Sequence, residues 1–597
     1  MHAIKILGLV GLMAASLTAC NDGSAGAAAS TSTAPGTLIY DPPIRLASLT
    51  ASAFAAQLNA SQSGQQLLAL AGTPACGVDF HYFQYQTIGG KGEATTASGA
   101  LMAPTGGSGC SGARPIVLYT HGTAATRSYN IANIQDSSNE AWGESALIAA
   151  MFAAQGYIVV ASNYAGYDSS PLPYHPYLNG AQQSQDVINA LIAARTALAG
   201  GLPSGDSDGG LLFITGYSQG GYVAMATHKA MQAAGMAVTA SMPMSGPYAL
   251  AAFGDAVVFG EVSVGSTVNF PLVINSYQQA YGNLYQTPSD FYSMTYASGI
   301  ASLLPTTSTL NALFQENLLP ELALFDSTTP VTGNSALDAA LSVPANPLLA
   351  SGFGNPYLIN NSVRVAAALD ALASPDGAFP TAMPGVPTAS NPQYGLRIDL
   401  KTNDLRDWMP DGSAPILLCG GHDDPEVWYS LNTSVMAAYW SGIVGSYPSN
   451  SLVQILDVDP GQPLESGGIA AQIGTIAATV FGYDLQAGRT SAQDLAGDVQ
   501  AAIVSGSAAS GPSPFAAYFT SGLPNSPQGI LVEGLAGVAA QAVVTEYGAG
   551  VTSPATMGTN VGFAIVEYYH YPVVQTACEV VAQGFFNAMV QQAQAAK

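Results

Sequence analysis

The stretch Leu211–Ala230, LLFITGYSQGGYVAMATHKA, decides the fold of this chain. It opens with an apolar run of strand length, passes through GYSQG at 216–220, and continues in a segment of helical composition. A serine in a G-x-S-x-G turn between a strand and a helix has its hydroxyl exposed as a nucleophile. Glycines suit this turn because side chains would crowd the tight crossing of the backbone. The stretch therefore predicts a nucleophilic serine at Ser218.

Alternating strand and helix patterns surround this stretch. Val78–Ile88 and Glu93–Pro104 predict two antiparallel strands that lead a sheet. The other expected elements are strands at Pro115–Tyr119, Gly156–Ser162, Val238–Met244, Pro415–Cys419 and Ser451–Val458, and helices at Trp142–Gln155, Ala181–Ala199 and Val574–Met589. This order predicts an α/β fold, with a mainly parallel sheet covered by helices on both faces.

Two long stretches interrupt the alternation. Residues 251–400 are expected to form a large helical cap over the site, with helices at Ser308–Leu324 and Val363–Leu372. Residues 461–555 predict a second helical insertion, with helices around Gly468–Phe481 and Leu531–Tyr547. The core is then built from residues 38–250, 401–460 and 556–597.

The order of residues along the chain selects the catalytic base. In enzymes with this turn, the acid follows the serine and the histidine comes last. The chain has seven histidines, and six of them do not fit this order. Four precede Ser218, namely His2, His81, His121 and His175. His228 lies in the helix directly after Ser218, and His422 lies in the loop of the expected acid. His570, in a predicted loop before the last helix, remains as the base that takes the proton of Ser218. The alternative is a buried core histidine.

The acid is expected in the loop after strand Pro415–Cys419. Asp424 stands three residues after Gly421, in a G-x-x-D-x-x-V pattern, and Asp423 is the alternative. A metal site made of His422, Asp423, Asp424 and Glu426 is the competing interpretation, although acidic loop turns are more common. We expect neither a metal nor a cofactor.

Two main-chain N–H groups are expected to stabilise a developing oxyanion. Gln219 begins the helix after the serine, where N–H groups point outward. His121-Gly122-Thr123 follows strand Pro115–Tyr119, so the N–H of Thr123 is the second expected donor, and His121 itself is structural.

The N-terminus resembles that of a bacterial lipoprotein. Residues 1–19 have a positively charged start and an apolar centre, and Leu17-Thr18-Ala19-Cys20 resembles a lipobox. We expect residues 1–19 to be removed, Cys20 to carry the lipid, and residues 20–37 to form a flexible tether. Asn21 favours the outer membrane of the cell envelope. An ordinary signal peptide, with a periplasmic or secreted product, is the alternative.

The remaining four cysteines are expected to form two disulfides in an exported protein. Cys76 and Cys110 flank the predicted strand pair, which leaves Cys419 to pair with Cys578. Four free thiols are the alternative.

The charge of the chain excludes several classes of partner. A formal net charge of −24, with only 13 Lys and Arg, opposes binding to nucleic acid or docking on anionic lipid through a basic patch. Beyond Ile6–Ala19, no run is long and apolar enough to span a membrane. We expect an ester substrate and membrane contact only through the N-terminal lipid, and the oligomeric state stays open.

The chain resembles α/β-hydrolases of the serine esterase and lipase kind, in the style of the secretory lipase family. The resemblance is carried by His121-Gly122-Thr123, Gly156–Tyr167, Tyr177–Gly180, the Ser218 turn and the Asp424 loop, although Asn163 stands where that family more often has Asp. It implies hydrolysis of carboxylic esters through Ser218, Asp424 and His570, with an acyl-enzyme intermediate.

Two other functions stay open from the sequence. One is a serine peptidase of the same fold, because Gly216–Gly221 also resembles the turn of prolyl aminopeptidases. The other is a non-catalytic surface lipoprotein on a hydrolase fold, although such proteins usually lose a triad member.

Overall fold

A computed structural model describes residues 28–29, 32–376, 391–421, 424–440, 453–457 and 569–596, with short gaps in the second and fourth of these ranges. Cys20, His422, Asp423 and the second insertion, with its two predicted helices, lie outside the described residues.

Among the described residues, the centre of the fold is a sheet of nine strands in the order β13-β12-β9-β8-β6-β7-β5-β4-β3. Its parallel part consists of β6 (Gly112–Thr120), β7 (Ile158–Ser162), β8 (Asp206–Tyr217), β9 (Ala240–Met244), β12 (Ile416–Gly420) and β13 (Val453–Asp457). The antiparallel edge consists of β3 (Ile44–Leu49), β4 (Gly77–Ile88) and β5 (Ala94–Thr105). The central parallel strands are apolar because helices cover both faces of the sheet. Strand β3 was not predicted.

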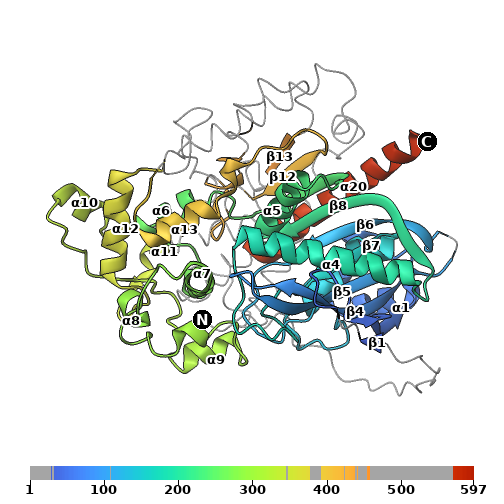
Figure 1. The fold of residues 1–597 in the computed structure, drawn as a ribbon, viewed down its shortest axis with the longest axis horizontal. Coiled ribbons are helices and arrows are strands. Elements are labelled where there is room, and N and C mark those ends of the chain that lie inside the picture. Colours follow the sequence, from blue (N-terminus) through green and yellow to red (C-terminus); the bar gives the residue numbers. More distant parts are fainter. Residues whose placement is uncertain are drawn as a thin grey trace.

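Helices cover the sheet on both faces. On one face α4 (Gly180–Gly200) packs against α5 (Gln219–Ala233), and Figure 1 shows α4 in front of the sheet. On the other face α3 (Trp142–Met151) and α20 (Thr576–Ala595) contact each other. Two further helices, α1 (Ala51–Asn59) and α2 (Gln62–Ala71), lie between β3 and β4 in the chain and were not predicted.

The helices between β9 and β12 gather beside the sheet, on the left of Figure 1. They are α6 (Leu250–Val258), α7 (Ser266–Tyr281), α8 (Pro288–Phe291), α9 (Leu310–Gln315), α10 (Ser335–Ala340), α11 (Pro347–Ala350), α12 (Asn361–Ala373) and α13 (Gly395–Thr402). A short parallel pair, β10 (Phe325–Asp326) and β11 (Phe353–Gly354), lies among them. We call residues 250–402 the cap.

Two predicted helices are shorter in the structure. The segment Ser308–Leu324 forms only α9, because Asn317 adopts a left-handed conformation with φ of 53°. The N–H of Leu318 then bonds to the carbonyl of Leu313, which is a common way for a helix to end. The segment Trp142–Gln155 divides after Met151 into α3 and a short 3-10 turn.

Disulfides join Cys76 to Cys110 and Cys419 to Cys578, which is the pairing expected from the sequence. Disulfides of this kind are typical of extracytoplasmic proteins. Among the described residues, no helix combines the length and the apolar character that a membrane span requires.

Candidate active site

Ser218 occupies a strained turn between β8 and α5. Its φ of 58° is unusual for a residue with a side chain, and its hydroxyl borders a pocket. The flanking glycines are required by space: a Cβ on Gly216 would lie 2.0 Å from Thr120 Oγ1, and one on Gly220 would lie 2.0 Å from the Thr120 carbonyl oxygen. Thr120 Oγ1 in turn donates to the carbonyl of Gly220 at 2.7 Å. The end of β6 therefore fixes the turn that presents the serine.

The structure brings Ser218, His570 and Asp424 into one hydrogen-bonded line. Ser218 Oγ lies 3.0 Å from His570 Nε2, and His570 Nδ1 lies 2.7 Å from Asp424 Oδ2. The three residues are almost fully buried, with exposed fractions of 3%, 0% and 1%. This geometry allows the imidazole to take a proton from the serine while the carboxylate holds the other ring nitrogen.

The acid loop holds Asp424 through its main chain. Asp424 Oδ1 accepts the N–H groups of Glu426 and Val427, each at 3.0 Å, which leaves Oδ2 for His570. Asp423 and His422 lie outside the described residues. Asp423 as the alternative acid, and a metal site that includes His422 and Asp423, therefore remain predictions from the sequence.

His570 lies in a π-helical turn, Tyr569–Gln575, that leads directly into α20. The sequence analysis predicted a loop here, which is wrong. A single π-helical turn has no regular apolar periodicity by which it could be recognised in a sequence. Such turns occur frequently at functional sites. Tyr217, the residue before the serine, donates its hydroxyl to the carbonyl of His570 and lies 3.1 Å from Nδ1.

The two expected oxyanion donors flank Ser218. Gln219 is the first residue of α5, and Thr123 follows the end of β6. Neither main-chain N–H bonds to a described residue, so both remain available to a ligand. Thr123 Oγ1 is engaged with the hydroxyl of Tyr177 at 2.8 Å.

A buried histidine that the sequence left without a role orients Gln219. His175 Nε2 lies 2.7 Å from Gln219 Nε2, and its Nδ1 lies 2.9 Å from the carbonyl of Ala165. Burial lowers the pKa of His175 to about 3, so the ring is neutral at neutral pH. Its Nδ1–H therefore donates to Ala165, and Nε2 accepts from the Gln219 amide. Nothing in the sequence marked this contact, which spans 44 residues.

The ring of His121 is held by two tyrosines and by the main chain. Its ring stacks between Tyr129 and Tyr164, with centroids 4.2 and 4.1 Å away, and its Nδ1 lies 2.7 Å from the Gly122 carbonyl. Burial lowers its pKa to about 4, so the ring is neutral at neutral pH. It supports the loop that carries Thr123.

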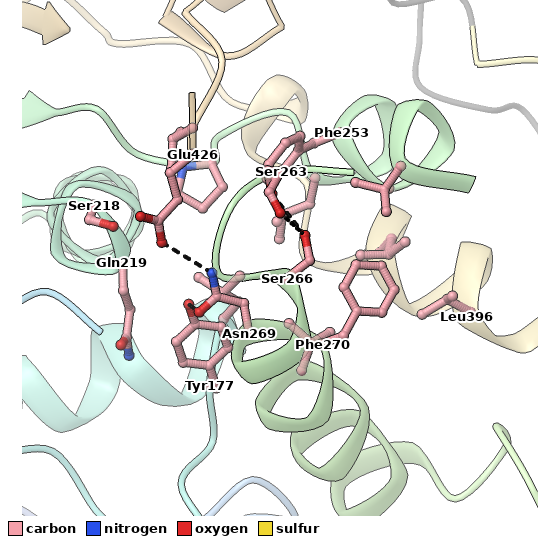
Figure 2. Close-up of a pocket in the computed structure, with 18 residues that line it drawn as sticks. Tyr177, Ser218, Gln219, Phe253, Ser263, Ser266, Asn269, Phe270, Leu396 and Glu426 are labelled. Carbon is pink, nitrogen blue, oxygen red and sulfur yellow. Dashed lines mark hydrogen bonds between the residues drawn. The ribbon is translucent and has the colours of Figure 1, made fainter. Parts of the chain in front are cut away.

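A pocket runs from Ser218 into the cap (Figure 2). Its deeper wall consists of apolar side chains from α6, α7 and α13, namely Leu250, Phe253, Val257, Phe270, Val273, Leu396 and Leu400. Near Ser218 the wall is polar and includes Glu426, Asn269 and Tyr177, as Figure 2 shows. An elongated ligand with a polar reacting group at one end and an apolar body would match this arrangement.

Glu426 is the acidic group of this pocket. Its Oε1 accepts from Asn269 Nδ2 at 3.3 Å, beside Gly265 at the N-terminal end of α7. A carboxylate is favourable at a helix N-terminus. Burial nevertheless raises the pKa of Glu426. The residue thus connects the acid loop to the cap.

The fold and the site define an α/β-hydrolase with a serine at its nucleophile turn. No family model and no curated protein matches the chain. Among solved structures it is similar to the rice cell wall degrading esterase LipA of Xanthomonas oryzae, at 28% identity and a TM-score of 0.54, over 72% of this chain and 92% of that one. It also shares its fold with a protein of Legionella pneumophila, at 18% identity and a TM-score of 0.50, over 71% of this chain and 91% of that one.

Proposed function

We propose that the protein is a serine esterase that hydrolyses carboxylic esters through Ser218, His570 and Asp424. The observation that carries this proposal is the line from Ser218 Oγ to His570 and Asp424, at 3.0 and 2.7 Å, at the mouth of a largely apolar pocket. The similarity to LipA, an esterase, supports the same reaction class.

The reaction would follow the two-step course of serine hydrolases. Ser218 Oγ attacks the ester carbonyl carbon while His570 Nε2 takes its proton. The carbonyl oxygen becomes an oxyanion beside the N–H groups of Gln219 and Thr123. The bond from carbon to the alcohol oxygen then breaks, and the alcohol leaves with the proton from His570.

Water completes the cycle. It attacks the acyl-enzyme as His570 takes one of its protons, and the carboxylic acid leaves when that proton returns to Ser218 Oγ. Asp424 holds Nδ1–H of His570 throughout and stabilises the imidazolium that forms in each step. The chemistry uses side chains and water, so it requires neither a metal nor a cofactor.

The pocket suggests which part of the substrate is recognised. The apolar side chains of its wall, such as Leu250 and Leu400, would receive the hydrocarbon part of the ester, because burying each CH₂ group is worth about 0.8 kcal/mol. Lipid esters and small esters with an apolar acyl group both fit this description.

We also propose that the enzyme works in the cell envelope. Two disulfides agree with export, and the lipobox-like segment ending at Cys20 supports anchoring through a lipid, with the outer membrane as the expected site. Mass spectrometry of the mature N-terminus tests this: an N-terminal Cys20 that carries lipid is expected, and cleavage elsewhere would contradict the anchor.

A peptidase of the same fold is the second candidate, and Glu426 is the observation that favours it. A buried carboxylate beside the nucleophile could bind the amine of a peptide substrate. One assay separates the two candidates: hydrolysis of p-nitrophenyl esters of graded chain length against amino-acid p-nitroanilides. We expect turnover of the esters, with kcat/KM rising as the acyl chain fills the pocket. Faster turnover of the anilides would overturn the esterase proposal.

A further inference from the structure

Side chains from several segments hold the loop His121–Ala124, which we call the oxyanion loop. Tyr164 donates its hydroxyl to the carbonyl of His121 at 3.0 Å, and Tyr167 donates to the carbonyl of Ala124 at 2.6 Å. The N–H of Gly122 donates to Glu144 Oε1 at 3.1 Å. The loop is therefore fixed by contacts outside itself, while the N–H of Thr123 bonds to no described residue.

Glu144 is itself held in one position. It belongs to the first turn of α3, and its Oε1 also accepts the hydroxyl of Tyr119 at 2.7 Å. Its Oε2 accepts the hydroxyl of Tyr129 at 2.8 Å. Both carboxylate oxygens thus have fixed donors, so Gly122 bonds to an acceptor whose position is set by the end of β6 and by Tyr129.

Gly122 lies directly against the catalytic serine. A Cβ placed on it would be 3.6 Å from the carbonyl oxygen of Tyr217 and 4.0 Å from Ser218 Cβ. Its carbonyl shares a peptide plane with the N–H of Thr123, and this carbonyl lies 2.7 Å from His121 Nδ1. Glu144 on one side of Gly122 and His121 on the other therefore set the direction of the Thr123 N–H.

We propose that Glu144 is a positioning residue of the oxyanion hole: by holding the N–H of Gly122, it aims the N–H of Thr123 at the oxyanion. The proposal rests on the proposed esterase function. Glu144 acts through Gly122 and does not touch the substrate. Its contribution is realised in the transition state, because the aimed donor matters most when the carbonyl oxygen becomes charged.

The first measurement compares kcat and KM of Glu144→Ala with the wild type on one p-nitrophenyl ester. We expect kcat to fall about 10- to 100-fold with little change in KM, because a misplacement of about 1 Å can cost on the order of 10²-fold. Glu144→Gln keeps an acceptor for Gly122 and should recover most of kcat. Should Glu144→Ala fail to fold, Glu144→Asp withdraws the acceptor by one methylene and is expected to show the same loss.

The second measurement distinguishes a misdirected Thr123 N–H from a general loss of protein stability. A trifluoromethyl ketone adds reversibly to Ser218 Oγ and places its oxyanion in the hole, whereas the product alcohol binds without one. In folded Glu144→Ala, affinity for the ketone should fall in parallel with kcat/KM, and affinity for the alcohol should stay near that of the wild type.

Glu140→Ala is the matched control. The Glu140 carboxylate accepts the N–H groups of Ala125 and Thr126, at 3.0 and 2.8 Å, farther along the same segment. We expect a smaller loss of kcat than in Glu144→Ala. Equal losses in the two variants, or unchanged ketone affinity in Glu144→Ala, would overturn the positioning role. Those results would leave the esterase function intact, whereas a wild type that does not hydrolyse esters would contradict that function.

Discussion

A disulfide joins Cys419 in β12 to Cys578 in α20 and so ties the strand before Asp424 to the helix after His570. Asp424 and His570 are 146 residues apart in the sequence and meet at 2.7 Å. The bond therefore closes the part of the chain that contains both the proposed acid and the proposed base.

Removing this disulfide should reduce activity under conditions in which the sheet stays folded. In the double variant Cys419→Ala/Cys578→Ala we expect kcat to fall by about 10- to 100-fold, since the acid and the base lose a shared support. Ester hydrolysis and far-ultraviolet circular dichroism at the same temperature provide the measurement.

The double variant Cys76→Ala/Cys110→Ala is the control for this experiment. Its disulfide joins segments at the other end of the sheet, before β4 and after β5. We expect it to lower the melting temperature with a smaller effect on kcat. Equal losses of kcat at equal stability would show that the position of the disulfide is irrelevant.

Asp424→Asn should reduce kcat by about 10⁴, because an amide at this position favours the wrong tautomer of His570. The two main-chain N–H groups that Asp424 Oδ1 accepts can still bond to the amide oxygen, so the loop should keep its shape. Steady-state kinetics of Asp424→Asn and Asp423→Asn check the assignment. A larger loss in Asp423→Asn would mean that the neighbouring carboxylate is the acid.

Glu579 should make the protein less stable as the pH rises. It is fully buried in α20, and burial, with repulsion from Glu144, raises its pKa to about 8 against a smaller opposing effect of the Tyr119 hydroxyl. An unfolded chain loses this proton near pH 4.3, whereas the folded protein keeps it until about pH 8. Unfolding therefore releases a proton in this window, and the free energy of unfolding decreases as the pH rises through it.

Denaturant unfolding of the wild type and Glu579→Gln from pH 4 to 9 tests this expectation. The variant cannot ionise, so its advantage over the wild type should be small near pH 4, grow up to about pH 8 and then level off. A difference that is independent of pH would show that Glu579 ionises as easily in the folded protein as in the unfolded chain.

Much of the core followed from local patterns in the sequence. The glycines around Ser218 are required by the local crossing of the backbone, so they predicted the turn. The apolar runs of the parallel strands are also local features, and they predicted the order of the sheet elements. His570 was selected by its order along the chain and lies beside Ser218 in the structure. Strand β3 was not predicted, because an edge strand with one exposed face has a weaker apolar pattern.

The contacts that position the site could not be predicted in the same way. Glu144 reads in the sequence as an acidic residue in the first turn of a helix, a common stabilising feature. Its contact with Gly122 depends on how α3 is set against β6, and the contact of His175 with Gln219 depends on the path of the chain before α4. No periodicity in the sequence records such long-range packing.

The rate of ester hydrolysis by Ser218→Ala tests most directly whether Ser218 is the nucleophile of an esterase. The substitution removes one buried oxygen, so circular dichroism and melting temperature should match those of the wild type. We expect kcat to fall by about 10⁶, as when the nucleophile of a serine hydrolase is removed. A folded Ser218→Ala protein that hydrolyses the ester within about tenfold of the wild-type rate would contradict it.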